Sequence, residues 1–312
     1  MNFSEKIFSV KNRFINNRKE KVVRIFGREI LSFKTFNLME GIIEYNNMPF
    51  TEDFEKDLSI HPKLSIVYPV YYTHNNFQDF ENLIEKYNQF SDEIKSHFEI
   101  IFVDDCSKYP IKLPKARLNM TLLRIEKDIP WNNSGARNLG ACYATTPKLA
   151  LMDADWFIPE STMEFLINVK LKDNEIMPLA YSYSKDEKAQ LDGVHPNLYC
   201  LNKHTFFNLN CYDENWCGFY GEDIFYRKYI MTKNVVFKIS KMPVYNNRDD
   251  LRQESHNLSR NTRTLKNRLK KMKKLEHKKE ILKFPWKYVE SQNLSGTSVN
   301  LEKEVTARIK GE

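Results

Sequence analysis

The sequence predicts an α/β protein with a mostly parallel sheet that is flanked by helices. Between residues 64 and 171, short apolar runs alternate with segments whose apolar residues recur at helical spacing. Strands that alternate with helices form parallel sheets covered on both faces. The 312 residues are 41% hydrophobic and 29% charged, which is a globular composition and excludes a disordered chain.

An accessory segment is predicted at residues 1–60, ahead of the main domain. Two apolar stretches, residues 22–26 and 30–33, flank a glycine-containing turn at residues 27–29 and indicate a β-hairpin extension. A short helix is expected from residue 36 to residue 45. We place the main domain at residues 61–260.

Four buried strands are predicted in the main domain. They are short apolar runs, and three of them stop abruptly at Pro69, Asp104 and Asp153. The runs span residues 64–68, 99–103, 120–125 and 148–152.

Three helices are predicted between and after these strands. In residues 76–90 five apolar side chains recur at helical spacing. An asparagine or serine can cap a helix over residues 133–143, and a proline suits the first turn of a helix over residues 159–171.

The C-terminal part, residues 261–312, is predicted to be a basic helix and a polar, weakly ordered tail. Residues 260–283 hold eleven basic and two acidic residues, a charge of +9 in a chain of net charge +7, so the remainder is near −2. The fold as a whole is therefore not a basic nucleic-acid binder. The helix over residues 262–282 either contacts an anionic membrane surface or packs on the core with a solvated basic face.

Several classes of protein are excluded by absent motifs. The chain contains neither GxGxxG nor GxxxxGK[ST], so the dinucleotide fingerprint and the P-loop are missing. No apolar run approaches the roughly 20 residues that span a bilayer, and no signal peptide is recognisable. The five cysteines include no CxxC pair and indicate reduced thiols. We expect a cytoplasmic protein, with peripheral attachment to the inner face of the membrane left open.

Polar clusters follow three of the predicted strands, where open α/β sheets bind ligands. They are Pro69-Val70-Tyr71, Asp104-Asp105 and Asp153-Ala154-Asp155. Two carboxylates one residue apart can face a divalent cation such as Mg²⁺ or Mn²⁺, which prefers oxygen ligands. The alternatives are solvated loop aspartates for the last cluster and an ordinary turn for the second.

Four further residues are candidates for binding or chemistry. Arg137 can bring a guanidinium to a phosphate, or it is a surface arginine on an ordinary helix. Asp223 can act as a general base beside Glu222, or both are first-turn residues favoured by the helix dipole. His256 is a candidate metal ligand whose assignment depends on the aspartates.

Taken in order, these motifs resemble glycosyltransferase family two, whose members have the GT-A fold. The resemblance covers about residues 64–260, and it rests on Leu64-Ser65-Ile66-Val67-Tyr68-Pro69, Val103-Asp104-Asp105-Cys106-Ser107, Gly135-Ala136-Arg137-Asn138-Leu139-Gly140 and Asp153-Ala154-Asp155. Gly221-Glu222-Asp223 and the His256 region resemble the acidic and histidine motifs of chondroitin polymerases and β-galactosyltransferases.

The resemblance implies a role for each matching residue. Asp104 or Asp105 would contact the uracil or ribose of a UDP-sugar, with Arg137 by the nucleotide and Pro69 and Tyr71 counted in the same site. Asp155 would ligate Mn²⁺ or Mg²⁺, Asp153 would contact the ribose or a metal-bound water, and His256 would complete the metal site. Asp223 would be the base, and Glu222 would bind the acceptor.

Three departures from the family pattern are visible. Cys106 replaces a glycine, Tyr71-Tyr72-Thr73 replaces Tyr-Asn, and Phe219-Tyr220-Gly221 stands where relatives have Trp-Gly-Gly. The third departure concerns the acceptor side of the site.

The function that the resemblance implies is a metal-dependent, inverting transfer of a hexose or N-acetylhexosamine. The donor would be a UDP-sugar and the acceptor a glycan or lipid-linked glycan in bacterial surface polysaccharide synthesis. Two alternatives stay open: a retaining GT-A transferase, or a nucleic-acid-binding protein acting through the basic helix. We expect no nucleic-acid partner.

Overall fold

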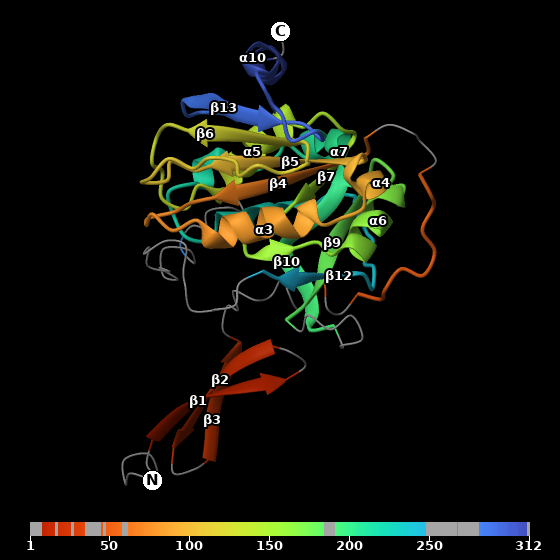
Figure 1. Ribbon diagram of the computed structural model, residues 1–312. Helices are drawn as coiled ribbons and strands as arrows, with labels where there is room; N and C mark the ends of the chain where they lie inside the picture. The colour runs from red at the N-terminus through yellow and green to blue at the C-terminus, as the bar shows by residue number, and fades with distance from the viewer. Residues whose placement is uncertain are drawn as a thin grey trace. The chain divides into compact units, whose positions relative to one another are not determined.

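The computed structural model describes most of the chain, and that part falls into two compact units, residues 1–48 and 49–312 (Figure 1). The described residues are 8–15, 18–25, 28–34, 45, 48–57, 62–183, 191–247, 267 and 281–310. Each unit is described by itself.

The first unit is a three-stranded antiparallel sheet in the order β1-β2-β3. The strands are β1 (Phe8–Ile15), β2 (Arg18–Ile25) and β3 (Arg28–Lys34). The predicted hairpin is confirmed as β2 and β3, in which Val23 lies opposite Leu31, and β1 is an additional strand. The helix predicted over residues 36–45 lies outside the described residues, except for the buried Tyr45.

The second unit is built on one mixed sheet, which has eleven strands within the described ranges. Its order is β14-β13-β6-β5-β4-β7-β10-β9-β12-β8, with β11 paired to β9. The strands are β4 (Leu64–Val70), β5 (Phe98–Asp104), β6 (Met120–Ile125), β7 (Lys148–Leu151), β8 (Trp156–Phe157), β9 (Glu175–Ser182), β10 (Gly193–Asn202), β11 (Val236–Phe237), β12 (Pro243–Asn246), β13 (Trp286–Gln292) and β14 (Ser298–Val299).

The centre of this sheet is parallel, as the sequence predicts. β6, β5, β4 and β7 run in one direction, while β10 is antiparallel to both β7 and β9. In the register of the central pair, Leu64 lies opposite Phe98 and Val70 lies opposite Asp104. The carboxyl ends of β4 and β5 therefore meet at one edge.

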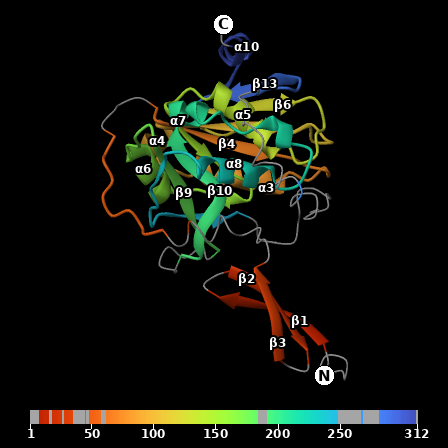
Figure 2. The same ribbon diagram turned by 180° about the vertical axis from the view of Figure 1, so that it is seen from behind.

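Helices cover both faces of the central strands. They are α3 (Gln78–Asn88), α4 (Asp92–Lys95), α5 (Asn133–Tyr143), α6 (Glu160–Asn168), α7 (Lys203–Asn208), α8 (Glu222–Ile230) and α10 (Glu302–Lys310), with the short 3-10 helix η1 (Glu214–Trp216). Figure 1 shows α3, α4 and α6 on the near face, and Figure 2 shows α5 and α8 on the far face.

Successive side chains of β4 point to opposite faces of the sheet, which explains why helices pack on both faces. Ile66 and Tyr68 belong to the same buried cluster as the apolar side of α3, which confirms the predicted helical spacing. Val67 faces the other way, against α5. A Cβ added at Gly140 of α5 would lie 2.4 Å from Val67 Cγ1, so this glycine allows the helix to rest on the strand.

The end of the chain differs from the expectation of a weakly ordered tail over residues 291–312. β13 pairs antiparallel with β6, β14 pairs with β13, and α10 follows. The prediction was wrong because the polar composition of this segment suits an edge strand, which needs only one apolar face. The predicted basic helix lies outside the described residues, except for Asn267, which is helical and exposed.

Within the described residues, none of the helices combines the length and the apolar character that crossing a bilayer requires.

Candidate active site

The candidate site lies at the edge where β4, β5 and β7 end. The backbone N–H of Asp105 donates to Val70 O at 2.9 Å, and that of Met152 donates to Val67 O at 3.0 Å. These bonds bring the segments that carry Asp104-Asp105 and Asp153 alongside the end of β4. Pro69 and Tyr71 are half-buried at the same end.

Asp104 is buried, and both of its carboxylate oxygens are used inside the protein. Oδ1 accepts from the backbone N–H of Ser107 at 2.8 Å, and Oδ2 pairs with Arg124. Burial raises the pKa of Asp104, although Ser107 and Arg124 oppose the rise. Asp104 thus holds the turn after β5 in shape.

Cys106 follows in a left-handed conformation, with φ of 60°. Left-handed backbone favours glycine, which is the residue that the family pattern has here. The departure noted in the sequence therefore keeps the backbone geometry and adds a side chain.

Asp105 is also buried, but only one of its carboxylate oxygens accepts a hydrogen bond from a described residue. Asn132 Nδ2 donates to Asp105 Oδ1 at 2.9 Å. Burial raises the pKa of Asp105 to about 7, and the charges of Asp104 and Asp128 add to the rise. The carboxyl group therefore changes charge close to neutral pH.

Arg137 is fully buried, which rules out the surface-arginine alternative. One guanidinium nitrogen donates to Asp153 Oδ1 at 2.6 Å, and another donates to the hydroxyl of Tyr212 at 3.0 Å. Asn133 Nδ2 also donates to Asp153 Oδ1, at 3.1 Å. Asp153 Oδ2 accepts no hydrogen bond from a described residue.

The Asp153-Ala154-Asp155 segment is a tight turn that joins β7 to β8. Trp156 N–H donates to Asp153 O at 3.0 Å, so the chain bends as two cation-facing carboxylates require. Asn247, at the end of β12, donates its N–H to Asp155 O at 2.7 Å. Its side chain accepts from Lys86 Nζ at 2.6 Å and donates to Asp79 O at 3.3 Å, which ties the turn to α3.

Glu222 and Asp223 are the first two residues of α8, after Gly221 at φ of 90°. Glu222 is buried, and burial together with the charge of Asp223 raises its pKa well above the usual range. The charges of Arg137 and Asp153 also act on Glu222, so α5, the turn after β7 and α8 contribute to one electrostatic neighbourhood. Asp223 is half-buried.

Two residues near this edge were missed by sequence reasoning. The His195 ring lies 4.9 Å from that of Trp156, and burial lowers the pKa of His195 to about 4 despite the nearby Asp153. Asn247 is the other. Neither residue belongs to a motif, and each reaches the turn through strands far along the chain, so no local signal could have found them.

The residues present fit a divalent cation by their chemistry. Asp153 and Asp155 offer the hard oxygen ligands that Mn²⁺ and Mg²⁺ prefer, and no described residue bonds Asp153 Oδ2. His256 lies outside the described residues. Within the described ranges, no group of three or more histidine, cysteine, aspartate or glutamate side chains is arranged to hold a metal.

The sequence model of Glycosyl transferase family 2 matches residues 65–233. The chain belongs to this family. The glycosyltransferase therefore carries the mixed α/β GT-A fold that the sequence predicts. No curated protein matched the chain.

Three solved structures resemble parts of the chain. S. aureus TarS 1-349 is 15% identical with a TM-score of 0.44, covering 59% of this chain and 60% of that one. Drosophila β1,4-galactosyltransferase 7 in complex with xylobiose is 10% identical with a TM-score of 0.44, covering 69% and 81%. The mannosyltransferase PcManGT from Pyrobaculum calidifontis, in complex with GDP-Man and Mn²⁺, is 15% identical with a TM-score of 0.47, covering 65% and 61%.

Proposed function

We propose that this glycosyltransferase moves a hexose or N-acetylhexosamine from a UDP-sugar to a hydroxyl group of a glycan or lipid-linked glycan, with inversion of configuration. The observation that carries the proposal is the turn after β7. There Arg137 fixes one carboxylate oxygen of Asp153, and no described residue bonds the other; Asp155 follows after one intervening residue.

The nucleotide would bind at the carboxyl ends of β4 and β5. Asp105 is the better candidate for the uracil or ribose contact, because both oxygens of Asp104 are already bonded. Pro69 and Tyr71 lie at the same end and would line this part of the site. Arg137 would act on the donor mainly through Asp153.

Mn²⁺ or Mg²⁺ would be held by Asp153 and Asp155, with His256 as a further ligand. Asn247, whose N–H is bonded to Asp155 O, precedes His256 by nine residues in the sequence. When bound, the cation neutralises charge that develops on the departing diphosphate, a contribution of several kcal/mol.

Asp223 would take the proton of the acceptor hydroxyl as that oxygen attacks the anomeric carbon. Its neighbour Glu222 has a raised pKa and stays protonated to higher pH, so it suits hydrogen bonding to the acceptor rather than proton removal. A base on the acceptor side favours a single displacement, which inverts the anomeric configuration.

The expected setting is bacterial surface polysaccharide synthesis in the cytoplasm. The basic residues between 260 and 283 would hold the enzyme against the anionic inner face of the membrane, where lipid-linked acceptors lie.

The deciding experiment measures release of UDP from UDP-sugars with Mn²⁺, with Mg²⁺ and with chelator. We expect Asp155→Asn to lower metal-dependent release about a hundredfold or more, because one ligand of the cation is lost. Glu164→Gln, an exposed carboxylate on α6, is the matched control and keeps full activity.

Two outcomes would overturn parts of the proposal. Full activity in Asp155→Asn would remove the metal assignment, and consumption of GDP- or CDP-sugars in place of UDP-sugars would remove the donor assignment. The anomeric configuration of the product, read by NMR, separates inversion from the retaining alternative.

A further inference from the structure

A cavity of about 250 Å³ lies at the amino ends of β5 and β6. Phe98 and Met120, the first residues of these strands, line it, whereas Asp104 ends β5 at the opposite edge of the sheet. β13, β14 and α10 close its other side. Its volume exceeds the roughly 150 Å³ that admits a benzene-sized molecule.

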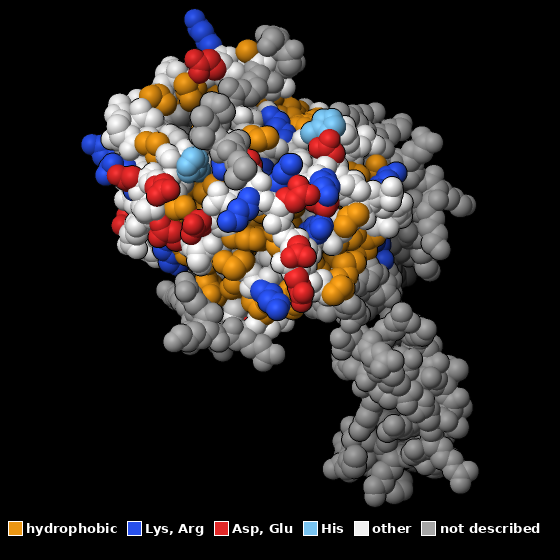
Figure 3. Space-filling view, turned by 90° about the vertical axis from the view of Figure 1, so that its right-hand side faces the viewer, with side chains coloured by type: hydrophobic (Ala, Val, Ile, Leu, Met, Phe, Trp, Pro, Cys, Tyr) orange, Lys and Arg blue, Asp and Glu red, His pale blue; other side chains and the backbone are white. Residues whose placement is uncertain are grey.

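The lining of this cavity is acidic and contains no cation. Fourteen described residues line it, and none of them is Lys or Arg, although the chain carries a net charge of +7. Two carboxylates, Glu99 and the exposed Glu304, stand among hydroxyl, amide and apolar side chains. Figure 3 looks at the amino-end side of the sheet, where acidic and basic side chains are intermixed on the surface.

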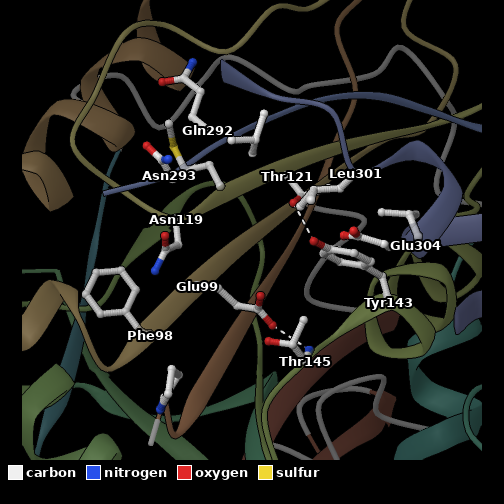
Figure 4. A pocket seen from close by; sticks show the side chains of 14 residues that line it. Phe98, Glu99, Asn119, Thr121, Tyr143, Thr145, Gln292, Asn293, Leu301 and Glu304 are labelled. Carbon is white, nitrogen blue, oxygen red and sulfur yellow. Dashed lines mark hydrogen bonds between the residues drawn. The ribbon is translucent and has the colours of Figure 1, made fainter. Parts of the chain in front are cut away.

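Only one of the two carboxylate oxygens of Glu99 accepts hydrogen bonds from described residues. Ser65 Oγ and the Thr145 N–H both donate to Glu99 Oε1 at 2.6 Å. Oε2 accepts no hydrogen bond from a described residue, and neither Glu99 nor Glu304 forms an ion pair with one. Figure 4 shows the Glu99 carboxylate with one oxygen bonded to Thr145.

The ligand that suits this lining is an organic cation rather than a metal ion. A metal site needs several ligating side chains close together, and the described residues provide no such group of three. An ammonium group needs only one unpaired carboxylate, and the aromatic and aliphatic walls favour an attached alkyl chain. Half-buried carboxylates form stronger charge-assisted hydrogen bonds than exposed ones.

We propose that this cavity binds a small alkylammonium ion, with its nitrogen at Glu99 and its alkyl chain beside Tyr143 and Leu301. Glu304 at the cavity adds negative charge that draws the cation in. The site lies at the edge of the sheet opposite the candidate active site.

The test uses the full chain with n-butylamine and 1,4-diaminobutane, and with 1-butanol and 1,4-butanediol as neutral molecules of nearly equal size. At fixed ionic strength, the amines are expected to raise the melting temperature and to give saturable heats by titration calorimetry, because they bind the folded state. The alcohols are expected to do neither.

Three variants separate the cavity from the general surface. Glu99→Gln keeps an acceptor for Ser65 and Thr145 but loses the charge, so amine affinity should fall about tenfold or more. Glu304→Gln should lower it by a smaller factor, because an exposed charge is screened. Glu302→Gln, on the same helix but outside the lining, should leave it unchanged.

The proposal would be overturned by alcohols that bind as well as the amines. It would equally be overturned by unchanged affinity in both Glu99→Gln and Glu304→Gln, or by absence of amine binding up to about 10 mM, where even a millimolar site is mostly occupied. If Glu99→Gln fails to fold, the amine affinity of Glu304→Gln compared with that of Glu302→Gln still tests the proposal.

Discussion

Asp104 and Asp105 are neighbours in the chain, yet their surroundings give them different tasks. Both carboxylate oxygens of Asp104 are bonded within the protein, one to Ser107 and one to Arg124, and these bonds hold the turn after β5. Asp105 has one amide partner, Asn132, and a pKa of about 7. A motif shows that two carboxylates are present, but only the local contacts show which one keeps an oxygen that no described residue bonds.

The raised pKa of Asp105 predicts a pH-dependent stability. A carboxyl with a folded-state pKa above its unfolded value of 3.8 stabilises the fold below pH 4, and this stability is lost as the pH rises toward 7. The Asp105→Asn side chain still accepts a hydrogen bond from Asn132 but carries no charge. The free energy of unfolding of this variant, measured against that of the native protein, should therefore rise by on the order of 2–4 kcal/mol between pH 4 and pH 8.

Urea unfolding at pH 4, 6 and 8 measures this difference. Asp92→Asn is the control with the opposite sign, because Lys95 and Arg117 lower the pKa of the exposed Asp92. An Asp105→Asn protein whose stability tracks the native protein at every pH would contradict the assignment.

At the scale of elements, the contact between α5 and β4 positions the site. α5 carries Arg137, and it can lie on β4 only because residue 140 has no side chain. Protein interiors are close-packed, so a single methyl group added at this contact would disturb the packing of α5 on β4.

Gly140→Ala is expected to destabilise the protein by about 1–3 kcal/mol, because its Cβ would lie 2.4 Å from Val67 Cγ1. In the double variant with Val67→Ala, the loss should be smaller than the sum of the two single losses, since the clash is removed. Chemical denaturation of the four proteins measures the coupling.

Gly218→Ala is the matched glycine control. It has no heavy atom within 4 Å of the added Cβ, so it should cost only the strain of its positive φ, about 1 kcal/mol. Strict additivity of Gly140→Ala and Val67→Ala would show that the helix does not rest on this contact.

At the scale of the whole molecule, the chain divides into a small antiparallel sheet and the transferase unit. The second unit contains the entire eleven-stranded sheet of the described ranges and its core. The first unit therefore contributes no strand to that sheet. Units with their own cores fold independently.

A chain that begins at Pro49 is therefore expected to fold cooperatively and to retain the proposed release of UDP from UDP-sugars within about threefold of the full chain. Circular dichroism melting and UDP release measure the two properties. Loss of cooperative melting in the shortened chain would show that the first unit supports the core of the second.

Local patterns in the sequence determined the central strands, the helices beside them and the strand-end clusters. This is so because burial, helical spacing and turn formation depend on residues close together in the chain. Family membership followed from the same clusters. The functional roles of all the site residues, including Asp223 and His256, stay predictions.

Tertiary structure alone decided which groups meet. It buried Arg137 against Asp153 and Tyr212, brought Asn247 to the turn after β7, paired β13 with β6, and enclosed the acidic cavity under α10. Each of these contacts except the Arg137–Asp153 pair joins residues more than 70 positions apart, and the free energy of such a contact depends on packing that no short segment encodes.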